Sequence, residues 1–182
     1  MSTLNRGGSA LLVIDVQVGV VAEAHAREAT IAAINTAIDK ARAANVPVIW
    51  VQHSDEELIL ESPEWEIAPE LAPASGEAKI RKLYPSSFEA TDLESVLAGL
   101  GVDHLYISGA ETNNCVRHTS HSALERGYDV TLITDAHTTT GFEWGGYVVD
   151  AARVIDEQNI NFLHKDLPGR TARGVSSAEL TF

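Results

Sequence analysis

The 182-residue chain has the composition of an ordinary globular protein, with 45% hydrophobic and 21% charged residues, and its length suits one domain spanning residues 1–182. Its formal net charge of −13 argues against binding to nucleic acid and against docking on anionic membranes, because both depend on clustered Lys and Arg. This charge is compatible with a small-molecule partner and mildly favours a cationic one.

The chain contains one cysteine, which excludes an intramolecular disulfide and a CxxC motif. Its N-terminus does not resemble a signal peptide, and no apolar run approaches the ~18 residues of a membrane span. We therefore expect a cytoplasmic protein.

Five short apolar runs predict strands that are buried on both faces. They cover residues 10–15, 48–52, 104–108, 130–134 and 160–163, and residues 78–82 form a weaker sixth candidate. Apolar residues recur at helical spacing between most of these runs. The helical stripes are Ile31, Ile34, Ile38 and Ala41; Leu93, Val96, Leu97 and Leu100; Val116, Ala123 and Leu124; and Tyr147, Val148, Ala151 and Ile155. Residues 53–79 are predicted to form a loop that serves as a lid or a pocket wall.

The alternation of strands and helices predicts an α/β fold, a three-layer α/β/α sandwich around a central, mostly parallel sheet of six strands. Ligands of such sheets bind beyond the carboxyl ends of the strands. The residues that follow the predicted strands include Asp15, His53, Lys82, Cys115 and His137. The sequence therefore places an acid, an ammonium, a thiol and imidazoles at one edge of the sheet, without showing which of them touch.

Cys115 is predicted to lie in the first turn of a helix that begins near Thr112 or Asn113, either of which can cap it. The helix N-terminus and a nearby Lys would lower the thiol pKa and favour the nucleophilic thiolate. The tight turn would also direct backbone N–H groups toward a point where an oxyanion could be held. The alternative is that a lone cysteine is a small buried apolar residue.

Asp15 and Lys82 also have structural alternatives. An Asp at the end of a strand can cap a turn, but in a partly dry pocket beside a thiol it could act as a general base whose pKa is raised by burial. A Lys is most often solvated, so Lys82 alone predicts no role.

Three motifs resemble the isochorismatase-like cysteine hydrolase family, which includes nicotinamidases, carbamoyl-amide hydrolases and isochorismatase. They are LLVIDVQ at 11–17, KLYPSSFEATDLE at 82–94 and GAETNNCV at 109–116, and the resemblance extends from about residue 10 to residue 165. It implies a Rossmann-like, isochorismatase-like fold.

The resemblance also implies site residues. Asp15 would be the general base, Lys82 the cation beside the thiolate, and Cys115 the nucleophile that forms an acyl-enzyme. A cis peptide bond would join Ala110 and Glu111, and the backbone N–H groups of Glu111 and Cys115 would form the oxyanion hole.

Nicotinamidase-like members bind a metal through an Asp-x-His motif after the second strand. Here the corresponding stretch is Val51-Gln52-His53, and residues 54–80 contain no second His. We therefore expect no metal and no cofactor, and the sequence disfavours nicotinamidase activity. The stretches WVQHSDEEL (50–58), DAHTT (135–139) and PGRTA (168–172) look closer to a subgroup that includes streptothricin hydrolases, which open a lactam.

Seven residues are candidates for substrate binding, and each has a structural alternative as a core anchor, a loop residue or a residue that orients the base. They are Gln17, His53, Trp65, Tyr84, Phe88, Asn114 and Trp144. Because relatives are commonly oligomeric, we expect a homo-oligomer, a dimer or a tetramer. The tail at 165–182 lacks strong periodicity and is expected to pack on a neighbouring subunit.

Together these features predict a metal-independent cysteine hydrolase that cleaves a C–N bond of an amide, lactam or carbamoyl small molecule through a Cys115 acyl-enzyme. The alternatives are an isochorismatase-type vinyl-ether hydrolase, for which the thiol would be dispensable, and a non-catalytic small-molecule-binding protein of the same fold. A redox thiol protein would need a partner chain, because no resolving Cys is present. A nucleotide-binding fold lacks its GxGxxG motif after the first strand.

Overall fold

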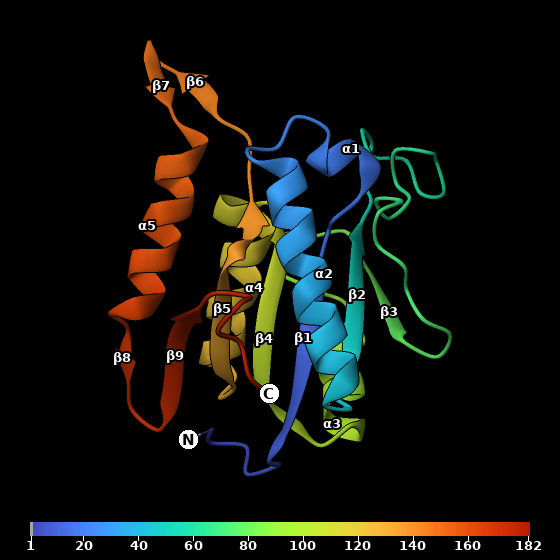
Figure 1. The fold of residues 1–182 in the computed structure, drawn as a ribbon, viewed down its shortest axis with the longest axis vertical. Helices are drawn as coiled ribbons and strands as arrows, with labels where there is room; N and C mark the ends of the chain where they lie inside the picture. The colour runs from blue at the N-terminus through green and yellow to red at the C-terminus, as the bar shows by residue number, and fades with distance from the viewer. Residues whose placement is uncertain (1) are drawn as a thin grey trace.

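A seven-stranded sheet in the order β3-β2-β1-β4-β5-β9-β8 forms the centre of the computed structural model, which describes residues 2–182 (Figure 1). The strands are β1 (Gly8–Ile14), β2 (Val48–His53), β3 (Ala78–Lys82), β4 (Val102–Ala110), β5 (Asp129–Thr138), β8 (Asp166–Leu167) and β9 (Arg170–Val175). All are parallel to their neighbours except β8, which pairs antiparallel with β9 at the edge. The predicted mostly parallel sheet is confirmed: six strands are parallel, including the weak candidate at 78–82, and the short antiparallel β8 adds a seventh.

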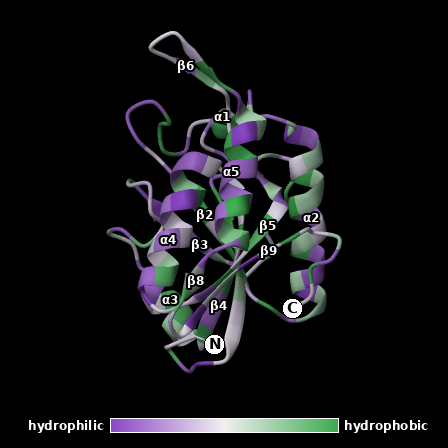
Figure 2. Ribbon diagram, turned by 90° about the vertical axis from the view of Figure 1, so that its left-hand side faces the viewer, coloured by the Kyte–Doolittle hydropathy of each residue, from purple (hydrophilic) through white to green (hydrophobic). Residues whose placement is uncertain are grey.

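Helices cover both faces of the sheet (Figures 1 and 2). They are α1 (Val18–Val21), α2 (Arg27–Ala43), α3 (Leu93–Gly99), α4 (Arg117–Glu125) and α5 (Ala151–Leu163). The apolar stripe of α2 packs in one core cluster, whereas α3, α4 and α5 contribute to the other. The sandwich is therefore the predicted three-layer arrangement. Among the described residues, no helix combines the length and the apolar character needed to cross a bilayer.

The central strand β1 explains why the strands read as continuous apolar runs. Ala10, Leu12 and Ile14 pack in the cluster with α3, α4 and α5, while Leu11 and Val13 pack in the cluster with α2. Successive side chains of a strand point to opposite faces, so a strand that is covered on both sides needs an apolar residue at every position.

The predicted strand at 160–163 is wrong, because these residues form the last turn of α5. Buried residues of α5 recur at Ala151, Gln158 and Phe162, which is a helical spacing, whereas Ile160 and Leu163 are exposed. The missing strand is β9, whose sequence RTARGV is only partly buried near the edge of the sheet. A polar strand of this kind leaves no continuous apolar run to read.

The predicted helical stripe beginning at Tyr147 and Val148 is also partly wrong. These residues lie in a hairpin of β6 (Phe142–Trp144) and β7 (Tyr147–Val149), which projects from the body in Figure 1. Gly145 and Gly146 join the strands with φ values of +58° and +81°, as a tight two-residue hairpin turn requires. Helix α5 begins only after Asp150, whose side chain accepts a hydrogen bond from the Arg153 N–H.

The C-terminal tail packs on its own chain. It supplies β8 and β9, and the following residues lie against α2, where Leu180 is buried. Lys40 Nζ donates hydrogen bonds to the carbonyl oxygens of Ser177, Ala178 and Leu180. These contacts hold the tail within its own chain, and its expected packing on another subunit stays a prediction.

Gly109 lies where β4 passes the end of β1. It pairs with Ile14 in the strand register, and an added Cβ would lie 1.9 Å from the Ile14 carbonyl oxygen. Its φ of +121° also falls in a region that other residues rarely adopt. Glycine is therefore required where the strands leading to Asp15 and Cys115 come together.

We expect Gly109→Ala to lower the free energy of unfolding by more than ~3 kcal/mol, because the new Cβ fits only if β1 and β4 separate. Gly76→Ala is the matched control, since Gly76 has a φ of +90° but no atom within 4 Å of an added Cβ. Its expected loss is about 1 kcal/mol, from backbone strain alone. Chemical denaturation compares the two, and equal losses would contradict the assigned clash.

Candidate active site

The order of the strands places a crevice between β1 and β4. From β1 the chain continues to β2 and β3 on one side, and later fills the other side with β4, β5 and β9. Connections that leave in opposite directions open a crevice at the carboxyl edge of the sheet. Asp15 follows β1 directly, with a φ of +50° that Asp tolerates better than most residues, and Cys115 follows β4.

The structure brings Asp15, Lys82 and Cys115 into contact. Lys82 Nζ lies 2.6 Å from Asp15 Oδ2 and 3.2 Å from Cys115 Sγ. Asp15 and Lys82 are each 1% exposed and Cys115 is 7% exposed. The three residues come from the ends of β1 and β3 and from the turn after β4, so only the fold could bring them together.

Cys115 lies in a single π-helical turn, η1 (Thr112–Val116), which precedes α4. The peptide bond between Ala110 and Glu111, just before this turn, is cis. The predicted capping role of Thr112 or Asn113 is wrong, because Glu111 occupies the N-cap position and no side chain caps the turn. Both side chains instead contact residues at the end of β5, which hold the turn in place.

Burial and then the negative charge of Asp15 raise the pKa of the Cys115 thiol to about 12, against the lowering effect of Lys82. The expected lowering of this pKa is therefore wrong for the resting site. Burial also raises the pKa of Asp15, again against Lys82. At neutral pH the thiol is protonated, and Asp15 is a stronger base than a carboxylate in water. The resting site therefore does not favour a thiolate.

His137, predicted to lie near this edge, supports the turn from behind. It is 2% exposed, its Nδ1 lies 2.9 Å from Thr112 Oγ1, and its Nε2 lies 2.8 Å from Asn159 Oδ1. Burial is the main cause that lowers its pKa to about 4. The native protein therefore holds this ring neutral in a structural position.

The pKa of His137 predicts a loss of stability in acid. The unfolded chain binds a proton near pH 6.5 and the native chain only near pH 4, so the stabilisation is complete above 6.5 and is lost as the pH falls toward 4. The full loss from this residue is about 3 kcal/mol. In His137→Gln, the fall in unfolding free energy between pH 6.5 and 4 should be smaller by roughly that amount. In the exposed control His164→Gln it should equal that of the wild type, and equal falls in all three proteins would contradict the assignment.

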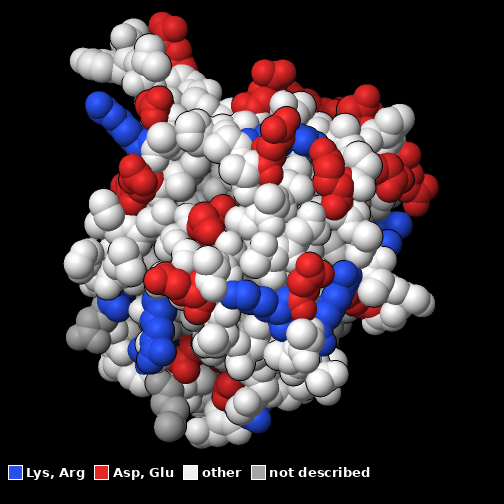
Figure 3. All heavy atoms as spheres, viewed as in Figure 1, with Lys and Arg blue, Asp and Glu red and all other residues white. Residues whose placement is uncertain are grey.

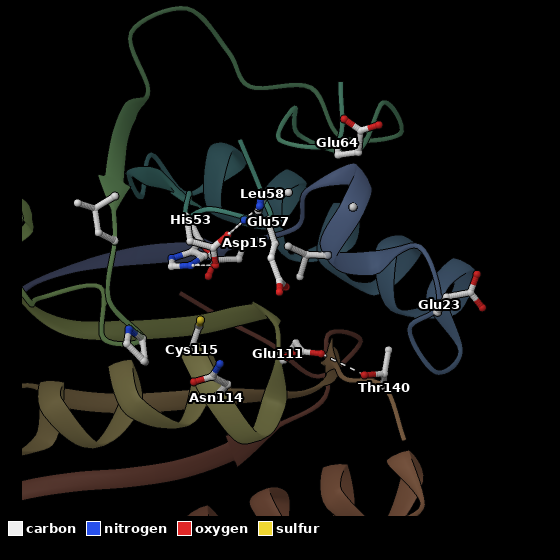
Figure 4. A pocket seen from close by; sticks show the side chains of 15 residues that line it. Asp15, Glu23, His53, Glu57, Leu58, Glu64, Glu111, Asn114, Cys115 and Thr140 are labelled. Carbon is white, nitrogen blue, oxygen red and sulfur yellow. Dashed lines mark hydrogen bonds and ion pairs between the residues drawn. The ribbon is translucent and has the colours of Figure 1, made fainter. Parts of the chain in front are cut away.

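Asp15 and Cys115 line a cavity of about 760 Å³. Figure 4 shows Asp15, His53 and Glu57 on one side of this space and Cys115, Asn114 and Glu111 on the other. The last residue of β2 and the loop after it contribute five of the lining residues, so the predicted role of residues 53–79 as a pocket wall is supported. They are His53, Asp55, Glu57, Leu58 and Glu64.

Two of the seven predicted substrate-binding residues, His53 and Asn114, line the cavity. Gln17 lies beside it, fully buried, and its amide group bonds the backbone of His53 and Trp65 and so ties the loop to β1. The other four lie outside the lining. Trp65 and Phe88 are buried, Tyr84 is half exposed, and Trp144 lies exposed on the β6–β7 hairpin.

The sequence interpretation missed a set of acidic lining residues. Besides Asp15, five carboxylates line the cavity: Glu23, Asp55, Glu57, Glu64 and Glu111. The available signal is the acidic run SDEE at 54–57 directly after β2, which by itself predicts only a loop. Hydrogen bonds from the backbone N–H groups of Leu58 and Glu57 lower the pKa of Asp55, and the hydrogen bond with His53 lowers it further. This carboxylate is therefore ionised at neutral pH.

The residues near His53 do not fit a metal centre. His53 Nε2 lies 3.0 Å from Asp55 Oδ2, and Val51, at the Asp position of the Asp-x-His motif, is buried in the core. Within residues 2–182, no group of three or more His, Cys, Asp or Glu side chains is arranged to hold a metal ion. Two neighbouring ligands are too few for a stable site.

Comparison with known proteins gives matches over most of the chain. The Isochorismatase domain matches residues 9–153. The secreted isochorismatase effector Isc1 of Verticillium dahliae is 34% identical over 143 residues, which cover 74% of this chain and 75% of that protein. A streptothricin hydrolase of Streptomyces noursei is 32% identical over 71% of this chain, and the match spans about half of that relative's length, 54%. Shorter matches are to proteins named N-carbamoylsarcosine amidase and maleamate amidohydrolase.

Among solved structures, a cysteine hydrolase from Pseudomonas syringae pv. phaseolicola superposes with a TM-score of 0.83 and 25% identity, covering 96% of this chain and 91% of that chain. The sheet order, the crevice and the sequence matches agree. The chain therefore belongs to the isochorismatase family of hydrolases.

Proposed function

We propose that this protein is a metal-independent cysteine hydrolase that cleaves a C–N bond of an amide, lactam or carbamoyl small molecule through an acyl-enzyme on Cys115. The observation that carries the proposal is the contact of Lys82 Nζ with both Asp15 Oδ2 and Cys115 Sγ, at 2.6 and 3.2 Å, beside a cavity that both Asp15 and Cys115 line. Matches to proteins named as an amidase and an amidohydrolase support the choice of bond.

The first half of the reaction forms the acyl-enzyme. Asp15 accepts the thiol proton while Cys115 Sγ attacks the substrate carbonyl carbon, and the carbonyl electron pair moves to its oxygen. The backbone N–H groups of Glu111 and Cys115, two residues that line the cavity, bind this oxyanion. Asp15 then returns the proton to the leaving nitrogen, the C–N bond breaks, and a thioester remains on Cys115.

The second half hydrolyses the thioester. Asp15, again a carboxylate, accepts a proton from a water molecule that attacks the carbonyl carbon. The C–S bond breaks, the acid product leaves, and the proton on Asp15 returns to the sulfur. Lys82 stabilises the negative charge that moves between Asp15 and Cys115, so the site gains no net charge when the thiolate forms.

The burial of this site explains why three groups are needed. A thiol with a pKa near 12 would rarely ionise alone at neutral pH. An adjacent base of raised pKa and a fixed ammonium lower the cost of the transient thiolate without holding it ionised at rest. At rest the thiol is therefore less reactive than a thiol held as a thiolate.

A substrate panel tests the proposal. Primary amides, lactams and N-carbamoyl compounds are incubated with the wild type and with Cys115→Ala, and released ammonia or amine and new carboxylate are measured. The proposal expects C–N cleavage by the wild type alone. Cleavage of a vinyl ether by both proteins, with no amide turnover, would instead establish the isochorismatase-type reaction. Ligand binding without turnover of any compound would indicate a non-catalytic binding protein.

Three broader expectations stay predictions. The exposed apolar side chains of the β6–β7 hairpin support association into a homo-oligomer, because an isolated chain would leave them in water. A cytoplasmic location rests on the sequence, and one relative is named a secreted effector. A single-domain organisation of residues 1–182 is proposed on the same basis.

A further inference from the structure

We infer that the cavity selects substrates that carry a positive charge, and that Glu57 is the residue that contributes most to this selection. The inference rests on the proposed function, because it describes the substrate of the same site. Three observations support it: the negative charge of the cavity lining, the lack of Lys and Arg among the described lining residues, and the direction of the Glu57 side chain.

The lining residues are unbalanced in charge. Asp15 is neutralised by Lys82, which leaves five carboxylates, and within the described chain no Lys or Arg lines the cavity. Figure 3 shows Asp and Glu side chains gathered at the end of the molecule where α1 and the loop after β2 lie. Four of the five, all except Glu111, are exposed, so their field acts through solvent. Clustered charges of one sign around a concave site still raise the local concentration of cations, and this effect weakens as salt is added.

Acidic residues elsewhere in the structure have partners that the cavity glutamates lack. Glu70 pairs with Arg27 at 2.7 Å, and Glu77 pairs with Arg42 at 2.8 Å. Glu57, in contrast, forms no ion pair with any residue of the described chain, and the same holds for Glu23 and Glu64. Unpaired like charges around one cavity repel one another, and a bound cation would relieve this repulsion.

Glu57 has the best position among these carboxylates. Figure 4 shows its side chain extending from the loop into the space opposite Cys115 and Glu111, whereas Glu23 and Glu64 lie farther out at the rim. Asp55 holds the backbone of this loop, since its Oδ1 accepts hydrogen bonds from the N–H groups of Glu57 and Leu58 at 2.9 and 2.7 Å. The loop therefore presents Glu57 in a defined direction while Asp55 itself is occupied.

A second, independent feature indicates that the cavity receives a ligand. Asp15 is 1% exposed and lines the cavity; its Oδ2 pairs with Lys82 and its carboxylate interacts with the Cys115 thiol, but its Oδ1 has no nitrogen or oxygen donor among residues 2–182. A buried carboxylate oxygen in this state is costly unless a donor approaches it. An ammonium-bearing amide would bring its reacting group to Asp15 and Cys115 and its positive charge to Glu57.

Reaction of Cys115 with charged thiol reagents tests the field without needing turnover. Three methanethiosulfonates are used, with a trimethylammoniumethyl, a sulfonatoethyl or a methyl group. In each case the thiolate sulfur attacks the reagent sulfur, a disulfide forms and methanesulfinate leaves. Cys115 is the one cysteine of the chain, so intact mass follows its modification directly. Rates are divided by those of 2-mercaptoethanol with the same reagents.

At low ionic strength the normalised cation-to-anion rate ratio is expected to be at least about 30, and to shrink as salt is added. In Glu57→Gln it should fall about fivefold. Glu56 is exposed like Glu57 but does not line the cavity. In Glu56→Gln the ratio should therefore stay within about twofold of the wild type, because solvent screens a charge that lies outside the cavity. A ratio near one, equal falls in the two variants, or no reaction with the methyl reagent would overturn the inference.

A pair of isosteric amides separates this inference from the proposed function. The p-nitroanilides of 4-(trimethylammonio)butanoic acid and 5,5-dimethylhexanoic acid differ in shape by little more than the replacement of N⁺ by C. Higher kcat/KM for the cationic member, lost in Glu57→Gln and kept in Glu56→Gln, supports both proposals. Equal turnover of the two amides would contradict the charge selection but would leave the hydrolase assignment supported. The expected cation-to-anion rate ratio with the thiol reagents, together with no turnover of either amide, would contradict the hydrolase assignment and leave the charge selection supported.

Discussion

Cys115→Ala is expected to lower kcat/KM for C–N cleavage by at least about 10⁴-fold, because it removes the only atom that forms the acyl-enzyme bond. The rest of the site should persist. Cys115 is 7% exposed at the edge of the core, and its replacement removes one sulfur atom, so the expected loss of stability is about 1 kcal/mol. Steady-state kinetics on the best substrate of the panel, with thermal unfolding as a check on folding, measures both effects.

Cys115→Ser is the matched variant for the same prediction. The hydroxyl keeps the shape of the side chain but is a far weaker acid than the thiol, so Asp15 cannot activate it equally well. We expect substrate binding close to that of the wild type and turnover near that of Cys115→Ala. Activity within tenfold of the wild type in either variant would show that Cys115 is not the nucleophile.

Asp15→Asn is expected to separate thiol reactivity from catalysis. The charge of Asp15 contributes to the raised pKa of Cys115, while Lys82 acts in the opposite direction. Removing the carboxylate should therefore lower the thiol pKa and speed alkylation of Cys115 by iodoacetamide at pH 7. Hydrolysis should nevertheless fall by about 10²–10⁴-fold, because no base remains to deliver a proton to the leaving nitrogen or to activate water.

These opposite changes distinguish a catalytic role for Asp15 from a structural one. Loss of Asp15 also leaves the buried Lys82 ammonium without its partner at 2.6 Å, with an expected destabilisation of about 3 kcal/mol or more. Unfolding that spread to the site would expose the thiol, so alkylation is measured alongside near-UV circular dichroism. Slower alkylation in a folded Asp15→Asn protein would contradict the electrostatic account of the thiol, and unchanged hydrolysis would exclude Asp15 as the base.

The central part of the fold could be predicted from the sequence because its strands are buried on both faces. In β1, side chains alternate between two covered core clusters, so the strand reads as an unbroken apolar run that ends at Asp15. The edge of the sheet could not be predicted in the same way. Strand β9 is only partly buried, and the apolar residues of 160–163 belong to a helix whose exposed face also carries Ile160 and Leu163.

The candidate site shows a similar division. Motif spacing placed Asp15, Lys82 and Cys115 at strand ends, but their contact depends on strand order, which no local pattern contains. The pKa of the thiol was misjudged because position at a helix start suggests stabilisation of an anion, whereas burial outweighs that effect here. The acidic lining arises from a loop without periodicity, and only the folded chain shows that Glu57 faces the nucleophile.

The central claim is that a covalent acyl-enzyme forms on Cys115, and rapid-quench mass spectrometry measures it most directly. Wild-type protein mixed with a turned-over amide and quenched in acid within milliseconds should gain the mass of the acyl group, and digestion should locate that mass on the peptide that contains Cys115. The adduct should form no more slowly than product is released, and it should not form in Cys115→Ala. Full turnover without any adduct, or an adduct on another residue, would contradict the mechanism.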